Sequence, residues 1–219
     1  MAQLDYQKII KKKGFVLIDF SDDQFINIKK EFFKLKDDKY LNSSKWIYRK
    51  RAFAEGIIKN RNLIWNKNNL FFQSKKINKF AGGISRKFPK LSELLKKNVE
   101  KFLIDKFSSR QMFKKKFKIG VHAIRIICKK NNRGFPVPEG FHTDGVDFVV
   151  IVPINSSNCV GGVSYLKSSK TKKIVLKKKL TKNMLLFNDR KLLHYATPIS
   201  LKNGKLGFRD IIVFTFLRK

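Results

Sequence analysis

The chain reads Phe-His-Thr-Asp-Gly-Val-Asp-Phe at residues 141–148 and continues with the apolar run Val-Val-Ile-Val at residues 149–152. A short apolar run bounded by turn residues predicts a buried strand. Residues i and i+2 of a strand point to the same face, so the His142 imidazole and the Asp144 carboxylate can bind one metal ion side by side. A third ligand, far away in the sequence, has to close such a site.

His194 is the best candidate for this third ligand. The chain has three histidines, and His122 lies in an apolar, strand-like stretch, where a core histidine or a histidine supporting the site from behind is expected. His194 stands on a predicted strand that follows the strand and turn of residues 185–190. Two histidines and one carboxylate on one face of an ion leave three positions open, the arrangement in which non-haem Fe(II) enzymes hold a co-substrate and O2.

Arg209 stands at the start of the last β-branched and aromatic segment, residues 209–216. A guanidinium offers a planar pair of donors that matches a carboxylate. An arginine at this place is expected if a dicarboxylate has to be gripped at its far end.

Short strands between polar turns make up most of the chain after residue 117. They are predicted at residues 118–127, 146–153, 161–166, 172–177, 183–188, 193–197 and 209–217, with one more at residues 15–18. Helices are predicted at residues 22–37 and from Pro89 onward, because apolar residues recur there at helical spacing. Helices followed by strands predict an α+β fold: a double-stranded β-helix, or cupin-like jelly roll, with the N-terminal helices packed on one sheet.

The length of 219 residues fits a single domain, residues 1–219. Residues 1–117 are predicted to be a mostly helical support region, and residues 118–219 to be the jelly-roll strands that carry the metal site. Residues 48–53, Tyr-Arg-Lys-Arg-Ala-Phe, are predicted to form an exposed basic loop. The alternative is a strand that presents Arg49 or Arg51 to an acidic group of a substrate.

Two features of the sequence predict a cytoplasmic protein, and the cysteines predict a chain without disulfides. No apolar stretch reaches the roughly 18 residues that a membrane span needs. The N-terminal residues 1–5 lack the charged-then-apolar order of a signal peptide. Cys128 and Cys159 are too few for a disulfide framework and are predicted to be reduced packing residues.

The segments around these candidate ligands resemble the 2-oxoglutarate/Fe(II)-dependent dioxygenases, and among them the free amino-acid hydroxylases of the L-isoleucine 4-hydroxylase type. The resemblance covers roughly residues 46–217. It is strongest at residues 138–148, Gly161-Gly162, Asn188-Asp189-Arg190 with His194, Thr197-Pro198 and Arg209-Asp210. Two positions depart from the pattern: Leu193 stands where an aromatic residue often precedes the distal histidine, and Ile211 stands where the serine of an Arg-x-Ser pair would be. The second departure leaves the hydroxyl partner of the 2-oxoglutarate carboxylate unassigned.

The resemblance implies an oxidoreductase that hydroxylates the side chain of a free L-amino acid and releases succinate and CO2. It implies Fe(II), 2-oxoglutarate and O2 as cofactors and co-substrates, with ascorbate as a reductant in vitro. His142, Asp144 and His194 would be the metal ligands, and Arg209 would bind the distal carboxylate of 2-oxoglutarate. Related halogenases lack the carboxylate ligand, so Asp144 favours hydroxylation.

Two charged residues close in sequence to the metal motif are candidate substrate contacts. Arg125 lies inside an apolar strand, where a charge needs a partner, so it either forms a structural ion pair or binds the substrate carboxylate. Glu139 stands three residues before His142 and either binds a substrate ammonium or braces the loop. Asp189, or a backbone carbonyl, is expected to orient the His194 ring.

The net charge of +34, from 50 basic and 16 acidic residues, keeps other partners open. A strongly basic chain suggests nucleic acid or another anionic surface as partner. One alternative is therefore the same chemistry on a macromolecule, by a nucleic acid or peptide hydroxylase or demethylase. Another is a non-enzymatic, nucleic-acid-binding protein, which would leave the order of His142, Asp144, His194 and Arg209 unexplained.

Overall fold

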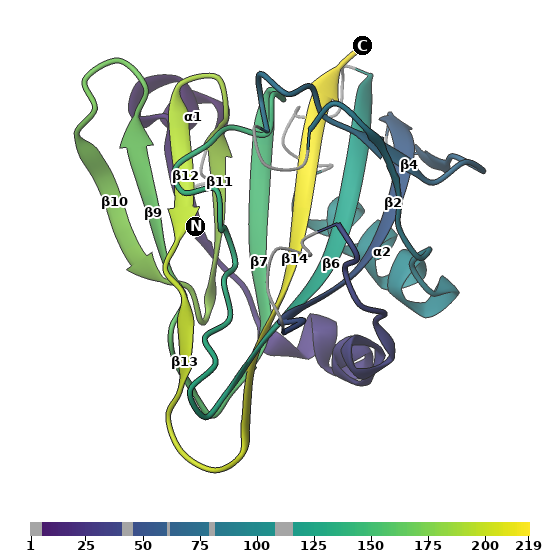
Figure 1. The fold of residues 1–219 in the computed structure, drawn as a ribbon. Coiled ribbons are helices and arrows are strands. Elements are labelled where there is room, and N and C mark those ends of the chain that lie inside the picture. The colour runs from purple at the N-terminus through teal and green to yellow at the C-terminus, as the bar shows by residue number, and fades with distance from the viewer. Residues whose placement is uncertain (1–5, 41–45, 61, 79–81, 108–115) are drawn as a thin grey trace.

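The computed structural model describes residues 6–40, 46–60, 62–78, 82–107 and 116–219 (Figure 1). Within them the helices are α1 (Tyr6–Lys13), the 3-10 helix η1 (Asp22–Lys34) and α2 (Glu93–Phe107). The strands are β1 (Phe15–Asp19), β2 (Arg49–Lys59), β3 (Asn62–Trp65), β4 (Leu70–Phe72), β5 (Ser85–Lys87), β6 (Phe117–Lys129), β7 (Phe148–Ser157), β8 (Cys159–Gly161), β9 (Val163–Ser168), β10 (Ile174–Lys179), β11 (Asn183–Asn188), β12 (Leu192–Ala196), β13 (Ile199–Leu201) and β14 (Leu206–Arg218). None of the helices described here has the length and apolar character needed to cross a membrane.

Two antiparallel sheets form a jelly-roll type fold. The large sheet has seven strands in the order β1-β11-β7-β14-β6-β2-β3, and the small sheet has three in the order β10-β9-β12. Figure 1 shows the small sheet beside the β11 and β7 side of the large one. Apolar side chains of both sheets form one cluster, in which Ile151 and Phe187 of the large sheet pack with Leu166 and Leu192 of the small sheet. The site described below lies near this cluster.

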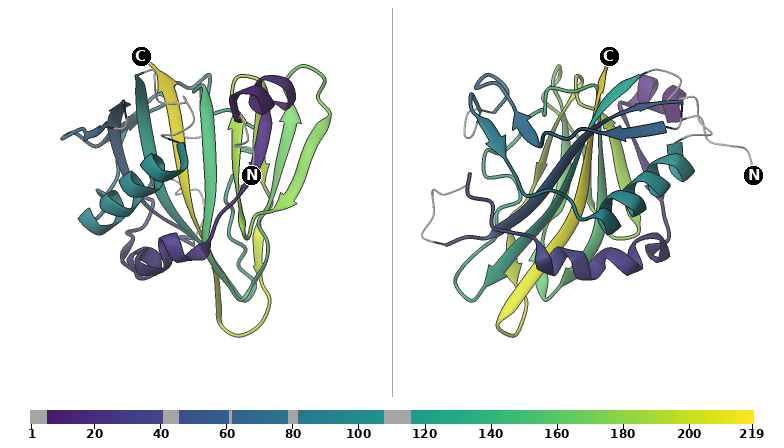
Figure 2. Two further views of the ribbon diagram at one scale, coloured as in Figure 1. Left: turned by 180° about the vertical axis from the view of Figure 1, so that it is seen from behind. Right: turned by 90° about the vertical axis from the view of Figure 1, so that its right-hand side faces the viewer.

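Helices η1 and α2 lie on the other face of the large sheet (Figure 2). Side chains alternate between the two faces of a strand, so every second residue of β14 faces the helices. The ring of Phe102, in α2, stacks on that of Phe214 with 5.6 Å between ring centroids, and it also contacts Phe25 of η1 at 4.9 Å. These side chains belong to the largest core cluster of the chain.

The strands predicted after residue 117 are all present, with their ends displaced by a few residues, and the short β8–β13 pair was not predicted. Residues 1–117 depart more from the prediction of a mostly helical region. They supply β1, β2 and β3 to the large sheet as well as the helices. The segment of residues 48–53 is not an exposed loop: it starts β2, which pairs with β6. The segment is therefore a strand, as the alternative has it, and a contact of Arg49 or Arg51 with an acidic group of a substrate stays a prediction.

Both predicted helices differ from those observed. The first is a 3-10 helix that ends at Lys34; residues three apart, such as Phe25 and Ile28, share a face in this tighter helix too, so the apolar spacing fits either form. The second begins at Glu93 rather than at Pro89, because the Pro89 carbonyl accepts a hydrogen bond from the Phe53 amide of β2 (2.9 Å). Ser92 then caps α2 through its Oγ, which accepts from the Leu95 amide at 3.3 Å.

Candidate metal centre

The loop between β6 and β7 carries His142 and Asp144, and β12 carries His194. The sequence prediction placed His142 and Asp144 on a strand, but only one isolated bridge forms there. In this bridge the His142 amide donates to the His194 carbonyl at 3.1 Å, and the His194 amide donates to the His142 carbonyl at 2.9 Å. This pair of hydrogen bonds holds the loop against β12 and brings the two imidazoles together.

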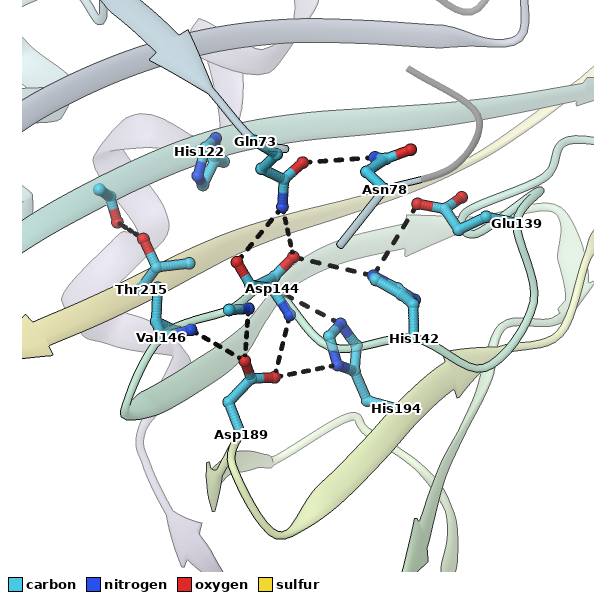
Figure 3. Close-up of polar contacts among 12 residues, drawn as sticks. Gln73, Asn78, His122, Glu139, His142, Asp144, Val146, Asp189, His194 and Thr215 are labelled. Carbon is cyan, nitrogen blue, oxygen red and sulfur yellow. Dashed lines mark hydrogen bonds and ion pairs between the residues drawn. The ribbon is translucent and has the colours of Figure 1, made fainter. Parts of the chain in front are cut away.

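The side chains of His142, Asp144 and His194 converge on one point (Figure 3). Asp144 Oδ1 lies 3.7 Å from His142 Nε2, and Asp144 Oδ2 lies 3.8 Å from His194 Nε2. One ligand atom from each residue lies within 4.8 Å of the other two, and among the described residues no other group of three His, Cys, Asp or Glu side chains does so. Metal–ligand bonds of roughly 2 Å span such separations with little movement. The residues fit a single metal ion.

Both histidines present Nε2 to this point. The His142 Nδ1 donates to the Gly140 carbonyl at 3.1 Å, which fixes the tautomer and leaves Nε2 free to bind. The His194 Nδ1 is buried, has no hydrogen-bond partner in the described ranges, and faces Asp189 Oδ1 at 3.7 Å. Burial, and then the nearby His142, hold the pKa of His194 well below its ordinary value. His194 is therefore neutral, as a metal ligand has to be.

Asp189 shapes the loop from behind. Its carboxylate accepts hydrogen bonds from three consecutive backbone amides, those of Asp144 (3.1 Å), Gly145 (2.8 Å) and Val146 (3.1 Å). Burial, and then the charge of Asp144, raise the pKa of Asp189 to about 7 despite these hydrogen bonds. Asp189 was expected to orient the His194 ring; it lies beside that ring, but its hydrogen bonds go to the loop.

Gln73 supports Asp144 from the opposite side, a role that no sequence motif predicts. Its amide nitrogen donates to Asp144 Oδ1 at 3.3 Å. Its amide oxygen accepts from Arg86 Nη2 at 2.7 Å and from Asn78 Nδ2 at 3.3 Å. The two acceptor contacts set the orientation of the Gln73 amide, so its nitrogen faces the carboxylate.

Arg209 and Ser164 line the same cavity as the three candidate ligands, a space of about 800 Å³ that includes its opening to solvent. Both side chains are buried, and Arg209 Nη2 and Ser164 Oγ have no hydrogen-bond partner among the residues that the structure describes. Gly162 makes room for the arginine: it has a φ of +66°, and a Cβ there would lie 2.8 Å from Arg209 Cδ. Burial lowers the pKa of Arg209 to about 10, so the side chain stays charged at neutral pH. A buried guanidinium and a buried hydroxyl that line one cavity offer a carboxylate a positive charge and a hydrogen-bond donor.

The two candidate substrate residues lie in different places. Arg125 is not at the cavity: its Nε and Nη2 each donate to the Asp210 carboxylate at 2.7 Å, and its guanidinium lies 3.7 Å from the centroid of the Phe33 ring of η1. It faces the helices, and the structural ion pair is the alternative that the structure favours. Glu139 does line the cavity, with Oε1 3.8 Å from His142 Nε2.

A second group of arginines, which includes Arg49, Arg51 and Arg86, lines the cavity near its β2 side. The strand alternative anticipated the first two, whereas Arg86 was not singled out. His122 lies among them: its ring stacks on Phe53 with 4.6 Å between centroids, and its Nδ1 contacts Arg51. Burial, and then Arg51, hold the pKa of His122 well below its ordinary value, so it is a neutral, supporting histidine.

Comparison with known proteins agrees with this geometry. A family model described as 2OG-Fe dioxygenase matches residues 29–215. The chain is 30% identical over 206 residues to the 3(1)-hydroxy-L-isoleucine 4-dioxygenase of Pantoea ananatis, covering 89% of this chain and 81% of that protein. It is 28% identical over 202 residues to the L-isoleucine-4-hydroxylase of Bacillus thuringiensis, covering 86% of this chain and 81% of the relative.

Solved structures show the same fold. The crystal structure of IDO from Bacillus thuringiensis has a TM-score of 0.77 at 23% identity, covering 100% of this chain and 98% of that one. A bsmA homolog from Methylobium petroleophilum PM1 has a TM-score of 0.82 at 22% identity, covering 97% and 91%. With the family match over most of its length, the chain belongs to the 2OG-Fe dioxygenases, oxidoreductases that use Fe(II), 2-oxoglutarate and O2.

Proposed function

We propose that this protein hydroxylates the side chain of a free L-amino acid, with 2-oxoglutarate as co-substrate. The observation that carries the proposal is a single cavity that combines a three-ligand metal centre, a buried arginine–serine pair and a second group of arginines. Such a cavity offers one place for a dicarboxylate and another for a small molecule with its own charged end. Two relatives whose names specify L-isoleucine or its hydroxylated form support the substrate class.

His142, Asp144 and His194 would hold the Fe(II). When bound, the iron supplies the oxidative chemistry: with O2 and 2-oxoglutarate it inserts one oxygen atom into an unactivated C–H bond, while 2-oxoglutarate gives succinate and CO2. The protein would orient the metal ligands and the bound molecules and would exclude water from the cavity. Asp189 holds the ligand loop through its backbone amides, and Gln73 holds the Asp144 carboxylate in place.

Arg209 would bind the distal carboxylate of 2-oxoglutarate, with Ser164 as the hydroxyl partner that the missing Arg-x-Ser pair left unassigned. Both have a buried polar atom that lacks a partner, and both face the cavity. A charge-assisted pair to the guanidinium and a hydrogen bond from the hydroxyl would satisfy both atoms at once. Ser164 lies on β9, so sequence position relative to Arg209 could not reveal it.

A second candidate function is the same chemistry on a nucleic acid or a peptide. The net charge of +34 favours it, since a field of this sign attracts polyanions. The cavity favours a small substrate, because the arginines of its wall are buried. The non-enzymatic alternative is not supported, because the chain belongs to an enzyme family.

We also propose that residues 1–219 form one domain that works in the cytoplasm. The single domain is supported by the large sheet, in which β1, β2 and β3 of the N-terminal half pair with strands of the C-terminal half. The cytoplasm is supported by Cys128 and Cys159, which are free thiols, as is usual in a reducing compartment.

The test is incubation of the enzyme with Fe(II), ascorbate, 2-oxoglutarate and pooled L-amino acids, followed by mass spectrometry. We expect one amino acid to gain one oxygen atom, in proportion to the succinate formed. Single-stranded DNA, RNA and a basic peptide serve as parallel substrates. If one of these is oxidised and no free amino acid is, the substrate class is wrong while the metal site and co-substrate stand.

A further inference from the structure

The β2 side of the cavity holds more buried positive charge than its carboxylates match. Arg49 is paired: its Nε and its Nη2 each lie 2.8 Å from Asp38 Oδ2. Arg51 reaches the same carboxylate only at 4.0 Å. Arg86 has no ion pair among the residues that the structure describes, although it is 2% exposed. Buried guanidiniums are expected to have an anionic partner.

The direct partners of these two arginines are neutral. Arg51 Nη2 donates to His122 Nδ1 at 2.5 Å, and Arg86 Nη2 donates to Gln73 Oε1 at 2.7 Å. The Nε atoms of both are buried, and neither has a hydrogen-bond partner within the described part of the chain. A charged donor left in this state costs free energy unless a ligand supplies the acceptor.

The guanidinium groups of Arg51 and Arg86 both lie near the rings of Phe71 and Phe88. Arg51 lies 4.2 Å from the centroid of Phe88 and 5.2 Å from that of Phe71. Arg86 lies 4.8 Å from Phe71 and 5.9 Å from Phe88. Burial, and then the charge of Arg49, lower the pKa of Arg51 to about 9, and the same two causes lower that of Arg86. Two like charges are thus packed together, and an anion between them would relieve their repulsion.

We infer that Arg51 and Arg86 form the subsite for the α-carboxylate of the amino-acid substrate, and that Glu139 accepts its ammonium group. The inference rests on the proposed function and assigns the polar end of the substrate. Glu139 lines the same cavity and has no hydrogen bond among the described residues. The carboxylates of Glu139 and Asp144 both face this space, which favours a zwitterion over a dianion such as phosphate.

Gln73 connects the subsite to the metal centre, because it forms hydrogen bonds with both Arg86 and Asp144. An amino acid bound there by its carboxylate and its ammonium group would direct its side chain toward the metal. The arrangement therefore selects side-chain carbons for oxidation, and it separates the substrate carboxylate from that of 2-oxoglutarate, which Arg209 would bind.

The experiment is an anaerobic titration of the protein loaded with Fe(II) and 2-oxoglutarate. The visible charge-transfer absorption of the Fe(II)–2-oxoglutarate complex reports co-substrate binding, and its change on adding amino acid reports substrate binding. The probes are L-isoleucine and L-isoleucinamide, which keeps the ammonium and side chain but lacks the carboxylate charge. The variants are Arg51→Met, Arg86→Met and the conservative Arg51→Lys and Arg86→Lys. Arg125→Lys, a buried arginine away from the cavity, is the matched control.

We expect L-isoleucine to bind the methionine variants about 10- to 100-fold more weakly than the wild type, since each loses charge-assisted hydrogen bonds. The affinity of the lysine variants for L-isoleucine should lie between that of the wild type and that of the methionine variants. L-isoleucinamide should bind weakly to the wild type and to every variant, and the affinity for 2-oxoglutarate should not change.

Wild-type affinity for L-isoleucine in all four variants would overturn the subsite and leave the proposed function standing. A loss of 2-oxoglutarate binding instead would assign these arginines to the co-substrate. If none of the twenty L-amino acids binds the wild type while 2-oxoglutarate does, subsite and proposed substrate class both fail.

Discussion

Asp189 gives the clearest case of one residue setting the geometry of the metal centre. Its buried carboxylate accepts the amides of Asp144, Gly145 and Val146, so the backbone that carries Asp144 has a fixed direction. Gly145 has a φ of +77°, which a side chain would strain. The loop can present Asp144 to the histidines without belonging to a strand.

Replacing Asp189 by asparagine should lower metal affinity. The asparagine amide keeps the size but offers one acceptor oxygen and places an NH2 against backbone N–H groups, so the loop loses its hold. We expect about 10- to 100-fold weaker binding of Mn(II), a redox-stable substitute for Fe(II), in a titration followed by electron paramagnetic resonance. Asp147→Asn is the control, since that carboxylate binds Arg190 and the Arg218 amide instead. Equal Mn(II) affinity in wild type and Asp189→Asn would refute this role.

Arg209→Lys should affect 2-oxoglutarate more than the amino acid. Lysine keeps the charge but loses the planar pair of donors, so the KM for 2-oxoglutarate should rise about 10- to 100-fold with a smaller change in the KM for the amino acid. Ser164→Ala removes a neutral donor and should raise the same KM less. The measurement is succinate formation at varied 2-oxoglutarate. An unchanged KM for 2-oxoglutarate in Arg209→Lys would contradict the assignment.

Strand β2 is the element whose burial was not predicted from the sequence. Alternating β-branched and apolar residues made the strands after residue 117 predictable, whereas Arg49-Lys50-Arg51 looked like a solvent-exposed loop. These arginines can be buried because they contact Asp38, His122 and two phenylalanine rings. Those partners lie elsewhere in the sequence and belong to no recognisable motif. The candidate metal ligands could be predicted because the chain has only three histidines and because the His-x-Asp motif precedes a distal histidine. Gln73, Arg86 and Ser164 carry no such signal.

Asp38→Asn should destabilise the protein by about 3–5 kcal/mol, because it leaves Arg49 buried without its partner. Burial alone would raise the pKa of Asp38, but Arg49, Arg51 and its hydrogen bonds outweigh it and hold the pKa below the ordinary 3.8. A carboxyl whose folded pKa is lowered stabilises the fold above its unfolded pKa and loses this contribution as the pH falls through the folded pKa. The difference between wild type and variant should therefore shrink below pH 3.8.

Urea unfolding at neutral and acidic pH measures this difference. The neighbouring Asp37→Asn is the matched control: Asp37 pairs with Lys50 at 3.0 Å, but its side chain is half exposed, so we expect a loss of about 0–1 kcal/mol. Equal losses for the two variants at neutral pH would show that the buried pair does not hold β2 in place.

The whole molecule carries a net charge of +34, and its co-substrate is a dianion. Such a field raises the rate at which anions arrive, and salt screens it over a Debye length of about 8–10 Å near physiological ionic strength. We expect kcat/KM for 2-oxoglutarate to fall as salt rises, while that for a zwitterionic amino acid changes little. The measurement is initial rate against KCl concentration. Equal salt dependence for both would indicate a general effect on the protein rather than attraction of the dianion.

We expect His142, Asp144 and His194 to hold one ion together, with 2-oxoglutarate on Arg209 and the amino acid beside it. The most direct measurement is a crystal structure of the protein with Fe(II), 2-oxoglutarate and L-isoleucine, grown without O2. We expect three protein–metal bonds of roughly 2 Å to these residues, with the distal carboxylate of 2-oxoglutarate on Arg209. An ion held by His142 and Asp144 with His194 more than about 4 Å away, or 2-oxoglutarate bound elsewhere in the cavity, would contradict it.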